Sequence, residues 1–124
     1  MLPFTFEKPE LVAKVGGGLV PAVVTASELA AFQAKCAASK AVCIANEDAM
    51  AVVELRYYGA VLELFVLMAR AFKHGAFGRQ EAVILQMARD LGARTLAFES
   101  RRRGWARRLG PQWHPRGNEF VRTV

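Results

Sequence analysis

The segment from Lys73 to Arg79, KHGAFGR, places two glycines and two cations just before a stretch with helical periodicity. The first amide groups of a helix have no partner within the helix and carry partial positive charge, so an anion is stabilised there. Glycines let the backbone approach such an anion closely. The segment is therefore compatible with a phosphate-bearing cofactor, and equally with an ordinary loop of glycine turns before a helix.

Two carboxylates lie in apolar, strand-like segments: Glu54 in AMAVVELRYY and Glu63 in AVLELFVLMARA. A carboxylate among apolar neighbours has a raised pKa, which suits a general base that deprotonates an amine near neutral pH. Glu63 is our candidate base, with Glu54 as the alternative. The interpretation we favour is that both residues face outward and pair with Arg56 or Arg70. No Ser-His-Asp or Cys-His pattern supports nucleophilic catalysis.

The C-terminal end of the chain is strongly basic. The net charge is +6, and seven arginines follow position 100 against a single acid, Glu119. Such an end can bind nucleic acid, phosphates or an acidic protein surface, and a solvated helix face explains it equally well. No spaced aromatic residues accompany the arginines, so base-specific recognition is not expected. The candidate interaction surface consists of Arg101, Arg103, Arg107 and Arg108.

The length and composition indicate one folded domain over residues 1–124, because 53% of the residues are hydrophobic and 23% are charged. The N-terminal MLPFTFEKPE does not resemble a signal peptide. The longest apolar run is interrupted by Glu63 and Arg70 and is too short to span a bilayer. We therefore expect a soluble protein without a membrane partner, located in the cytoplasm or packed inside a particle, and not secreted.

The cysteines and histidines do not suggest a metal centre. Cys36 and Cys43 are compatible with a disulfide, but two buried free thiols in a reducing compartment are favoured. His74 and His114 each lack a second ligand at metal-binding spacing, so no metal site is predicted.

Hydrophobic periodicity predicts helices followed by strands in the first half of the chain. Residues 25–36 form the best early helix, since Thr25 and Glu28 fit a capping box. Strands are expected at residues 40–46, 49–58 and 60–71, joined as antiparallel hairpins. The third of these runs is also compatible with a buried helix, but its β-branched and aromatic content favours a strand. Shorter elements, a strand at 3–6 and a helix at 8–15, precede them.

The second half alternates helix and strand. Val83, Ile84, Met87 and Leu91 share one face of a helix that Gly92 ends. The run 94–100 is then a strand, and because a helical crossover precedes it, it should lie parallel to the strand at 60–71. A short helix at 101–109 and a strand at 118–124 close the chain.

This order of elements resembles the GNAT family of N-acetyltransferases from about Lys40 to the C-terminus. The segment ARDLGARTLAFES resembles the end of that family's third helix entering its fifth strand, and RRGWARRLG resembles the helix that follows. The resemblance implies an α+β fold with αβα layers: a mixed, mostly antiparallel sheet with one parallel pair around a central helix.

In that family the fourth and fifth strands splay apart and acetyl-CoA lies between them, its pyrophosphate held by amides of a loop patterned Arg/Gln-x-x-Gly-x-Gly/Ala. In this chain Ala76 takes the place of the first glycine. The family's proton-donating tyrosine position falls on Ala106, which cannot donate a proton. The resemblance assigns cofactor binding to Met68, Lys73, Gly75, Ala76, Gly78 and Arg79.

These departures make a non-catalytic GNAT-like protein the expected function. Small degenerate proteins of this kind occur among the virion and assembly proteins of tailed bacteriophages. The resemblance therefore implies other virion or assembly proteins as partners, and nucleic acid as a further partner of the arginine-rich end. The alternative is an active N-acetyltransferase that uses acetyl-CoA on a small amine or a protein amine. Acetyl-CoA is expected only if the chain is active.

Overall fold

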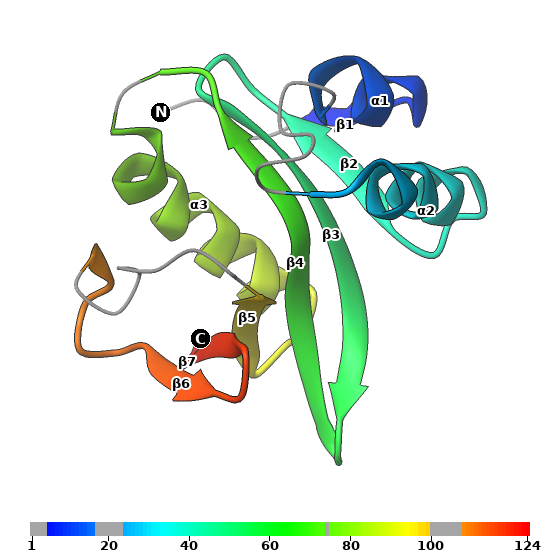
Figure 1. Ribbon diagram of the computed structural model, residues 1–124. Helices are drawn as coiled ribbons and strands as arrows, with labels where there is room; N and C mark the ends of the chain where they lie inside the picture. Colours follow the sequence, from blue (N-terminus) through cyan, green and yellow to red (C-terminus); the bar gives the residue numbers. More distant parts are fainter. Residues whose placement is uncertain (1–4, 17–23, 74, 100–107) are drawn as a thin grey trace.

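The computed structural model describes residues 5–16, 24–73, 75–99 and 108–124. It is an α+β fold in which a seven-stranded mixed sheet has helices on both faces (Figure 1). The strands lie in the order β1-β2-β3-β4-β5-β7-β6. Their bounds are β1 Thr5–Glu7, β2 Val42–Ala45, β3 Ala49–Tyr58, β4 Val61–Ala71, β5 Thr95–Glu99, β6 His114–Arg116 and β7 Glu119–Thr123. The helices are α1 Glu10–Gly16, α2 Ala26–Ala37 and α3 Ala76–Asp90.

The helix signals in the sequence are confirmed. The Thr25 hydroxyl accepts from the Glu28 amide at 3.1 Å and the Glu28 carboxylate accepts from the Thr25 amide at 3.0 Å, which completes the capping box of α2. Gly92 lies just beyond α3 with a φ of 80°, the left-handed conformation that ends helices. In the part of the chain that the structure describes, no helix is long and apolar enough to cross a membrane.

The three predicted central strands are also confirmed. β2 pairs with β3 and β3 with β4, both antiparallel, so the run at 60–71 is a strand and not a buried helix. A bulge near Val52 and Val53 interrupts the β3–β4 ladder. Because successive side chains of a strand point to opposite faces, this ladder fixes which residues meet α3 and which meet α1 and α2.

β4 and β5 form the one parallel pair of the described sheet, as the helical crossover predicted. Their register runs from Glu63 opposite Thr95 to Val66 opposite Phe98. β4 continues beyond this point to Ala71, whereas β5 ends at Glu99. The two strands are therefore paired along only part of β4.

The C-terminal hairpin differs from the prediction. β6 pairs antiparallel with β7, and the sequence did not predict β6 because Pro115 occupies its centre. The strand lies at the sheet edge, where a residue without an amide hydrogen is tolerated. The helix expected at 101–109 lies almost entirely outside the described residues.

A separate apolar core lies on each face of the sheet. On one face α3 packs on the strands through Ile84, Leu85 and Ala88, which contact Leu64 and Leu96. On the other face α1 and α2 cover a second cluster (Figure 1). This second cluster contains Val12, Leu29, Cys43, Met50, Val52 and Met68. Cys36 and Cys43 are free thiols, as expected, and burial is the main cause that raises the pKa of Cys43 to about 11.

Candidate functional site

The backbone of the loop before α3 has the conformation of a helix N-terminus. Gly75 is the N-cap residue, with a φ of 74° that favours glycine, and α3 starts at Ala76. The Ala76 side chain is only 2% exposed, so its methyl group is buried and does not cover the outer surface of the loop. His74 lies outside the described residues.

Gly75 and Gly78 are expected to respond to alanine in opposite directions. Gly75→Ala should lower the free energy of unfolding by about 1–2 kcal/mol, because a Cβ is strained at this positive φ. Gly78 lies in the first turn of α3 with open space around an added Cβ. Gly78→Ala should therefore raise the stability by roughly 0.5–1 kcal/mol. Urea unfolding of the two variants checks this pair, and a stabilised Gly75→Ala would contradict the assignment of the N-cap.

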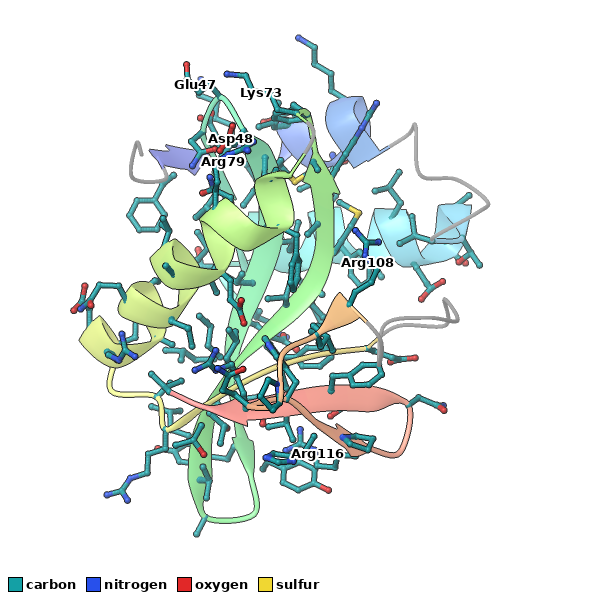
Figure 2. The ribbon with its side chains drawn as sticks, turned by 90° about the vertical axis from the view of Figure 1, so that its left-hand side faces the viewer. Glu47, Asp48, Lys73, Arg79, Arg108 and Arg116 are labelled. Atoms are coloured by element: carbon teal, nitrogen blue, oxygen red, sulfur yellow. The ribbon has the colours of Figure 1, made fainter. Side chains whose placement is uncertain are left out.

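The cations of the loop face carboxylates from the β2–β3 turn (Figure 2). Arg79 donates to Asp48 through Nε at 2.8 Å and Nη2 at 3.2 Å. Lys73 Nζ lies 4.0 Å from a Glu47 carboxylate oxygen. The hydrogen bond from Arg79 is the main cause that lowers the pKa of Asp48. The positive charge that would attract a pyrophosphate is thus balanced within the chain.

A buried amide ties the β2–β3 turn to the first turn of α3. Gln80 donates to Asp48 at 2.7 Å and accepts from Asn46 Nδ2 at 2.8 Å. Asn46 Oδ1 in turn accepts from the backbone amides of Asp48 and Ala49. The cluster was not predicted, although the polar run Asn46 to Asp48 between two apolar strands indicates a turn. The cluster fixes the carboxylate of Asp48 beside Arg79.

The six residues assigned to the cofactor do not all lie together. Five of them follow one another along the loop and the first turn of α3: Lys73, Gly75, Ala76, Gly78 and Arg79. Met68 is buried in the core cluster beneath α1 and α2, on the face of the sheet opposite α3.

Aromatic side chains gather where β4 and β5 part. Trp113 is buried and meets Phe98, the last β5 residue paired with β4, edge to face at a centroid distance of 5.3 Å. Phe120 packs against Phe98 at 5.6 Å. Trp113 Nε1 donates to Glu81 on α3 at 2.6 Å. Through Trp113, these contacts connect α3 to Phe98 of β5, at the point where β5 separates from β4.

Glu63 is fully buried and surrounded by hydrogen-bond donors. Arg116 donates to both of its carboxylate oxygens, each at 2.9 Å. Arg56 Nε donates at 2.8 Å and the Thr95 hydroxyl at 3.0 Å. Glu119 accepts from both arginines, at 2.8 and 2.7 Å, so two cations and two anions form one network. Figure 2 shows Arg116 at the β6–β7 end of the sheet.

The prediction that Glu63 has a raised pKa is wrong. Burial alone would raise the pKa, but the hydrogen bonds from Arg116, Arg56 and Thr95 outweigh burial, so the pKa is lowered from 4.5. The residue is also not outward-facing, although Arg56 is its partner as expected. Glu54 pairs with Lys35 at 2.9 Å rather than with Arg70.

The basic end of the chain is partly neutralised. Arg116 belongs to the Glu63 network, and Arg122 lies 3.1 Å from Glu81. Arg108 is exposed. The remaining members of the predicted interaction surface, Arg101, Arg103 and Arg107, lie outside the described residues, as does Ala106.

Comparison of the chain with protein-family models, with curated proteins and with solved structures finds no match in any of the three.

Proposed function

We propose that this chain is a GNAT-like domain that does not catalyse acetyl transfer and acts through contacts with other proteins. The order of the strands supports the first part of the proposal. A parallel β4–β5 pair follows antiparallel hairpins, with α3 as the crossover between its strands. The pairing stops at Val66 and Phe98, in keeping with the splayed strands that the resemblance implies.

The closed network around Glu63 supports the second part of the proposal, that the domain does not catalyse acetyl transfer. A general base must have a lone pair directed at its substrate and must accept a proton during the reaction. Both oxygens of Glu63 already accept from guanidinium groups. Protonation would leave Arg56 and Arg116 with only Glu119 as an anionic partner in this network. These contacts favour an ionised, structural carboxylate.

The ion pair between Arg79 and Asp48 supports the same proposal. An incoming pyrophosphate would approach a helix terminus whose nearest cation already holds a carboxylate at 2.8 Å. Repulsion by Asp48 would offset part of the attraction from the helix amides.

The setting that the resemblance implies is a tailed-bacteriophage particle or its assembly. The partners would then be other virion or assembly proteins, with packaged DNA as a further partner of the arginine-rich end. Capsid, portal or tail genes beside this gene would support the setting. A neighbourhood of metabolic genes would contradict it.

A second candidate function is an active acetyl-CoA-dependent N-acetyltransferase. The observation that favours it is the glycine N-cap of α3 close to the point where β4 runs on beyond β5. Such a helix start offers amides to a phosphate group. In this function Glu63 would be the base, and the cofactor contacts would come from Lys73 to Arg79.

Acetyl-CoA at millimolar concentration is expected to leave the thermal unfolding midpoint unchanged. A ligand present at about 100 times its Kd would stabilise the fold by roughly 2.7 kcal/mol. Differential scanning fluorimetry measures the shift, and Asp48→Asn serves as the comparison because it removes the competing carboxylate. A clear shift for the unaltered chain, together with turnover of acetyl-CoA and an amine, would replace our proposal with the enzyme.

A further inference from the structure

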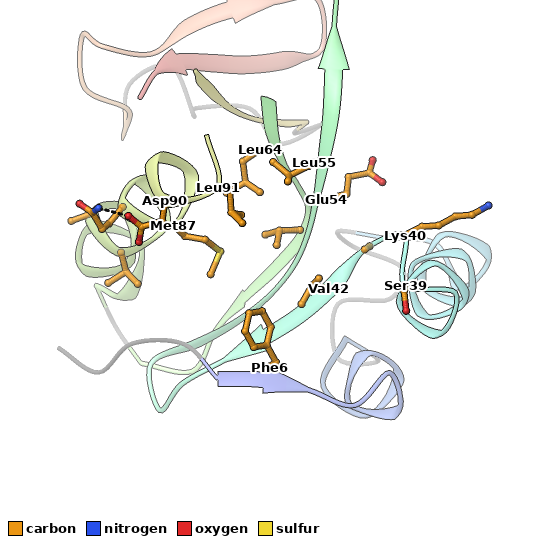
Figure 3. Close-up of a pocket in the computed structure, with 15 residues that line it drawn as sticks. Phe6, Ser39, Lys40, Val42, Glu54, Leu55, Leu64, Met87, Asp90 and Leu91 are labelled. Atoms are coloured by element: carbon orange, nitrogen blue, oxygen red, sulfur yellow. Dashed lines mark hydrogen bonds between the residues drawn. The ribbon is translucent and has the colours of Figure 1, made fainter. Parts of the chain in front are cut away.

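An apolar groove of about 1000 Å³ runs beside α3 on the α3 face of the sheet (Figure 3). Its strand wall includes Phe6 of β1, Val42 of β2 and Leu55 of β3. Its helix wall includes Met87 of α3 and Leu91, the C-cap residue of that helix. The groove therefore lies between α3 and four strands of the sheet, since Leu64 of β4 also lines it.

The sheet register explains why these side chains meet. Phe6 lies opposite Ile44, and Val42 lies opposite Val53, so both point to the face that α3 partly covers. Leu55 and Tyr57 follow Val53 at intervals of two and share that face. Four exposed apolar residues of this face lie on the strands, and the fifth is the C-cap residue of α3. Their exposed fractions are Phe6 77%, Tyr57 72%, Leu91 47%, Leu55 43% and Val42 38%.

We propose that this groove is the contact face of a symmetric dimer of this chain. The surface carries both an apolar groove and an aromatic ring that projects at its border, so it can complement a second copy of itself. With a two-fold axis along the groove, the β1–β2 wall of each copy faces the α3 wall of the other. Phe6 then packs on Val83 and Met87 of the opposite helix.

The charges at the border of the groove fit the same arrangement. Asp90 lies on the α3 side of the groove, and Lys40 lies on the opposite side with its side chain directed away from the groove (Figure 3). The two-fold axis exchanges the walls, so the backbone of Lys40 comes opposite the partner's Asp90, and its long side chain turns toward the groove in the dimer, twice per assembly. Each chain carries a net charge of +6, and these two pairs place opposite charges where the copies meet.

The exposed area favours a protein partner over a small apolar ligand. A ligand within the groove would leave Tyr57 in water, because this ring is 72% exposed and does not line the groove. An aromatic side chain buries roughly 150–250 Å². Two such rings and three aliphatic side chains supply a large share of the roughly 800 Å² per partner that a stable interface needs.

The dimer does not depend on the proposed function. Glu63 points to the face covered by α1 and α2, because it pairs with Arg56 and is offset by one residue from Leu64 of the α3 core. Lys73 and Gly75 precede α3, and the groove lies along its later turns. An active or an inactive domain can dimerise through this groove.

Sedimentation velocity of the full chain, from micromolar to millimolar concentration, tests the proposal. A concentration-dependent rise to the mass of two chains is expected, and Phe6→Asp should weaken association at least ten-fold. Phe72→Asp is the matched control, since Phe72 is 45% exposed but does not line the groove, and it should associate normally. Circular dichroism checks that both variants are folded. A chain that stays monomeric throughout, or one that Phe6→Asp and Leu91→Asp both leave unchanged, overturns the proposal.

Charge reversal then tests the two-fold arrangement. Lys40→Glu and Asp90→Lys should each weaken the dimer several-fold, and the double variant should restore it. The contrary result is a double variant whose loss of dimer affinity equals the sum of the losses in the two single variants. Such additive losses would show that the two walls do not face each other. That result would overturn the proposed axis.

Discussion

Replacing Glu63 with glutamine is expected to lower the free energy of unfolding by about 3–5 kcal/mol, the range for breaking a buried ion pair by removing one partner. The carboxylate is fully buried and faces Arg56 and Arg116, which are themselves largely covered. Glutamine keeps one acceptor oxygen but removes the charge that balances two guanidinium groups. The network would then hold two cations and the single anion Glu119.

Equilibrium unfolding in urea measures this loss. Glu54→Gln is the control, because Glu54 lies on the preceding strand and pairs with the partly exposed Lys35. Its loss should stay near 0.2–1 kcal/mol, roughly the value of an exposed ion pair. Equal, small losses in both variants would contradict a structural role for the Glu63 network.

Acid should reveal the same network in the unaltered chain. Because the folded pKa of Glu63 lies below its usual 4.5, its ion pairs contribute full stability above that pH. The contribution is lost as the pH falls below 4.5 and through the lower folded pKa. The Glu63→Gln variant lacks this group, so its thermal midpoint should fall less between pH 5 and pH 3, on the order of the lost contribution.

Replacing Trp113 with alanine is expected to cost about 3–5 kcal/mol, the range for removing a large buried aromatic side chain. The ring packs in the α3 core and meets Phe98 edge to face. Its indole nitrogen donates to Glu81 at 2.6 Å, and the Arg122 guanidinium lies 6.0 Å from the ring centroid. One residue therefore connects the segment before β6 to β5 and α3.

Two control variants separate the ring from its hydrogen bond. Trp113→Phe keeps most of the buried surface but loses the donor to Glu81, so a loss of about 1–2 kcal/mol is expected. Tyr57→Ala removes a ring that is largely exposed, and the monomer should lose no more than about 0.5 kcal/mol. Chemical denaturation at low protein concentration compares the three. A Trp113→Ala variant as stable as Tyr57→Ala would show that the packing at Phe98 does not hold the strands.

Local patterns in the sequence determined most of the secondary structure. The capping box at Thr25, the alternation along β3 and the glycine after α3 each depend on neighbours a few residues apart. The parallel pairing of β5 also followed from the sequence, because a helical crossover returns a strand in the same direction. β6 was missed because its central proline is the residue that local rules exclude from strands.

The tertiary structure alone decided the chemistry of the candidate site. Glu63 meets Arg56, Thr95 and Arg116 at sequence separations of 7, 32 and 53 residues. Asp48 meets Arg79 at a separation of 31. Apolar neighbours in the sequence suggested a raised pKa for Glu63, whereas the cations that fold against it lower the pKa. The periodicity of a segment records which face is buried, but the pKa of a buried carboxylate depends on charges that distant strands bring within hydrogen-bonding distance.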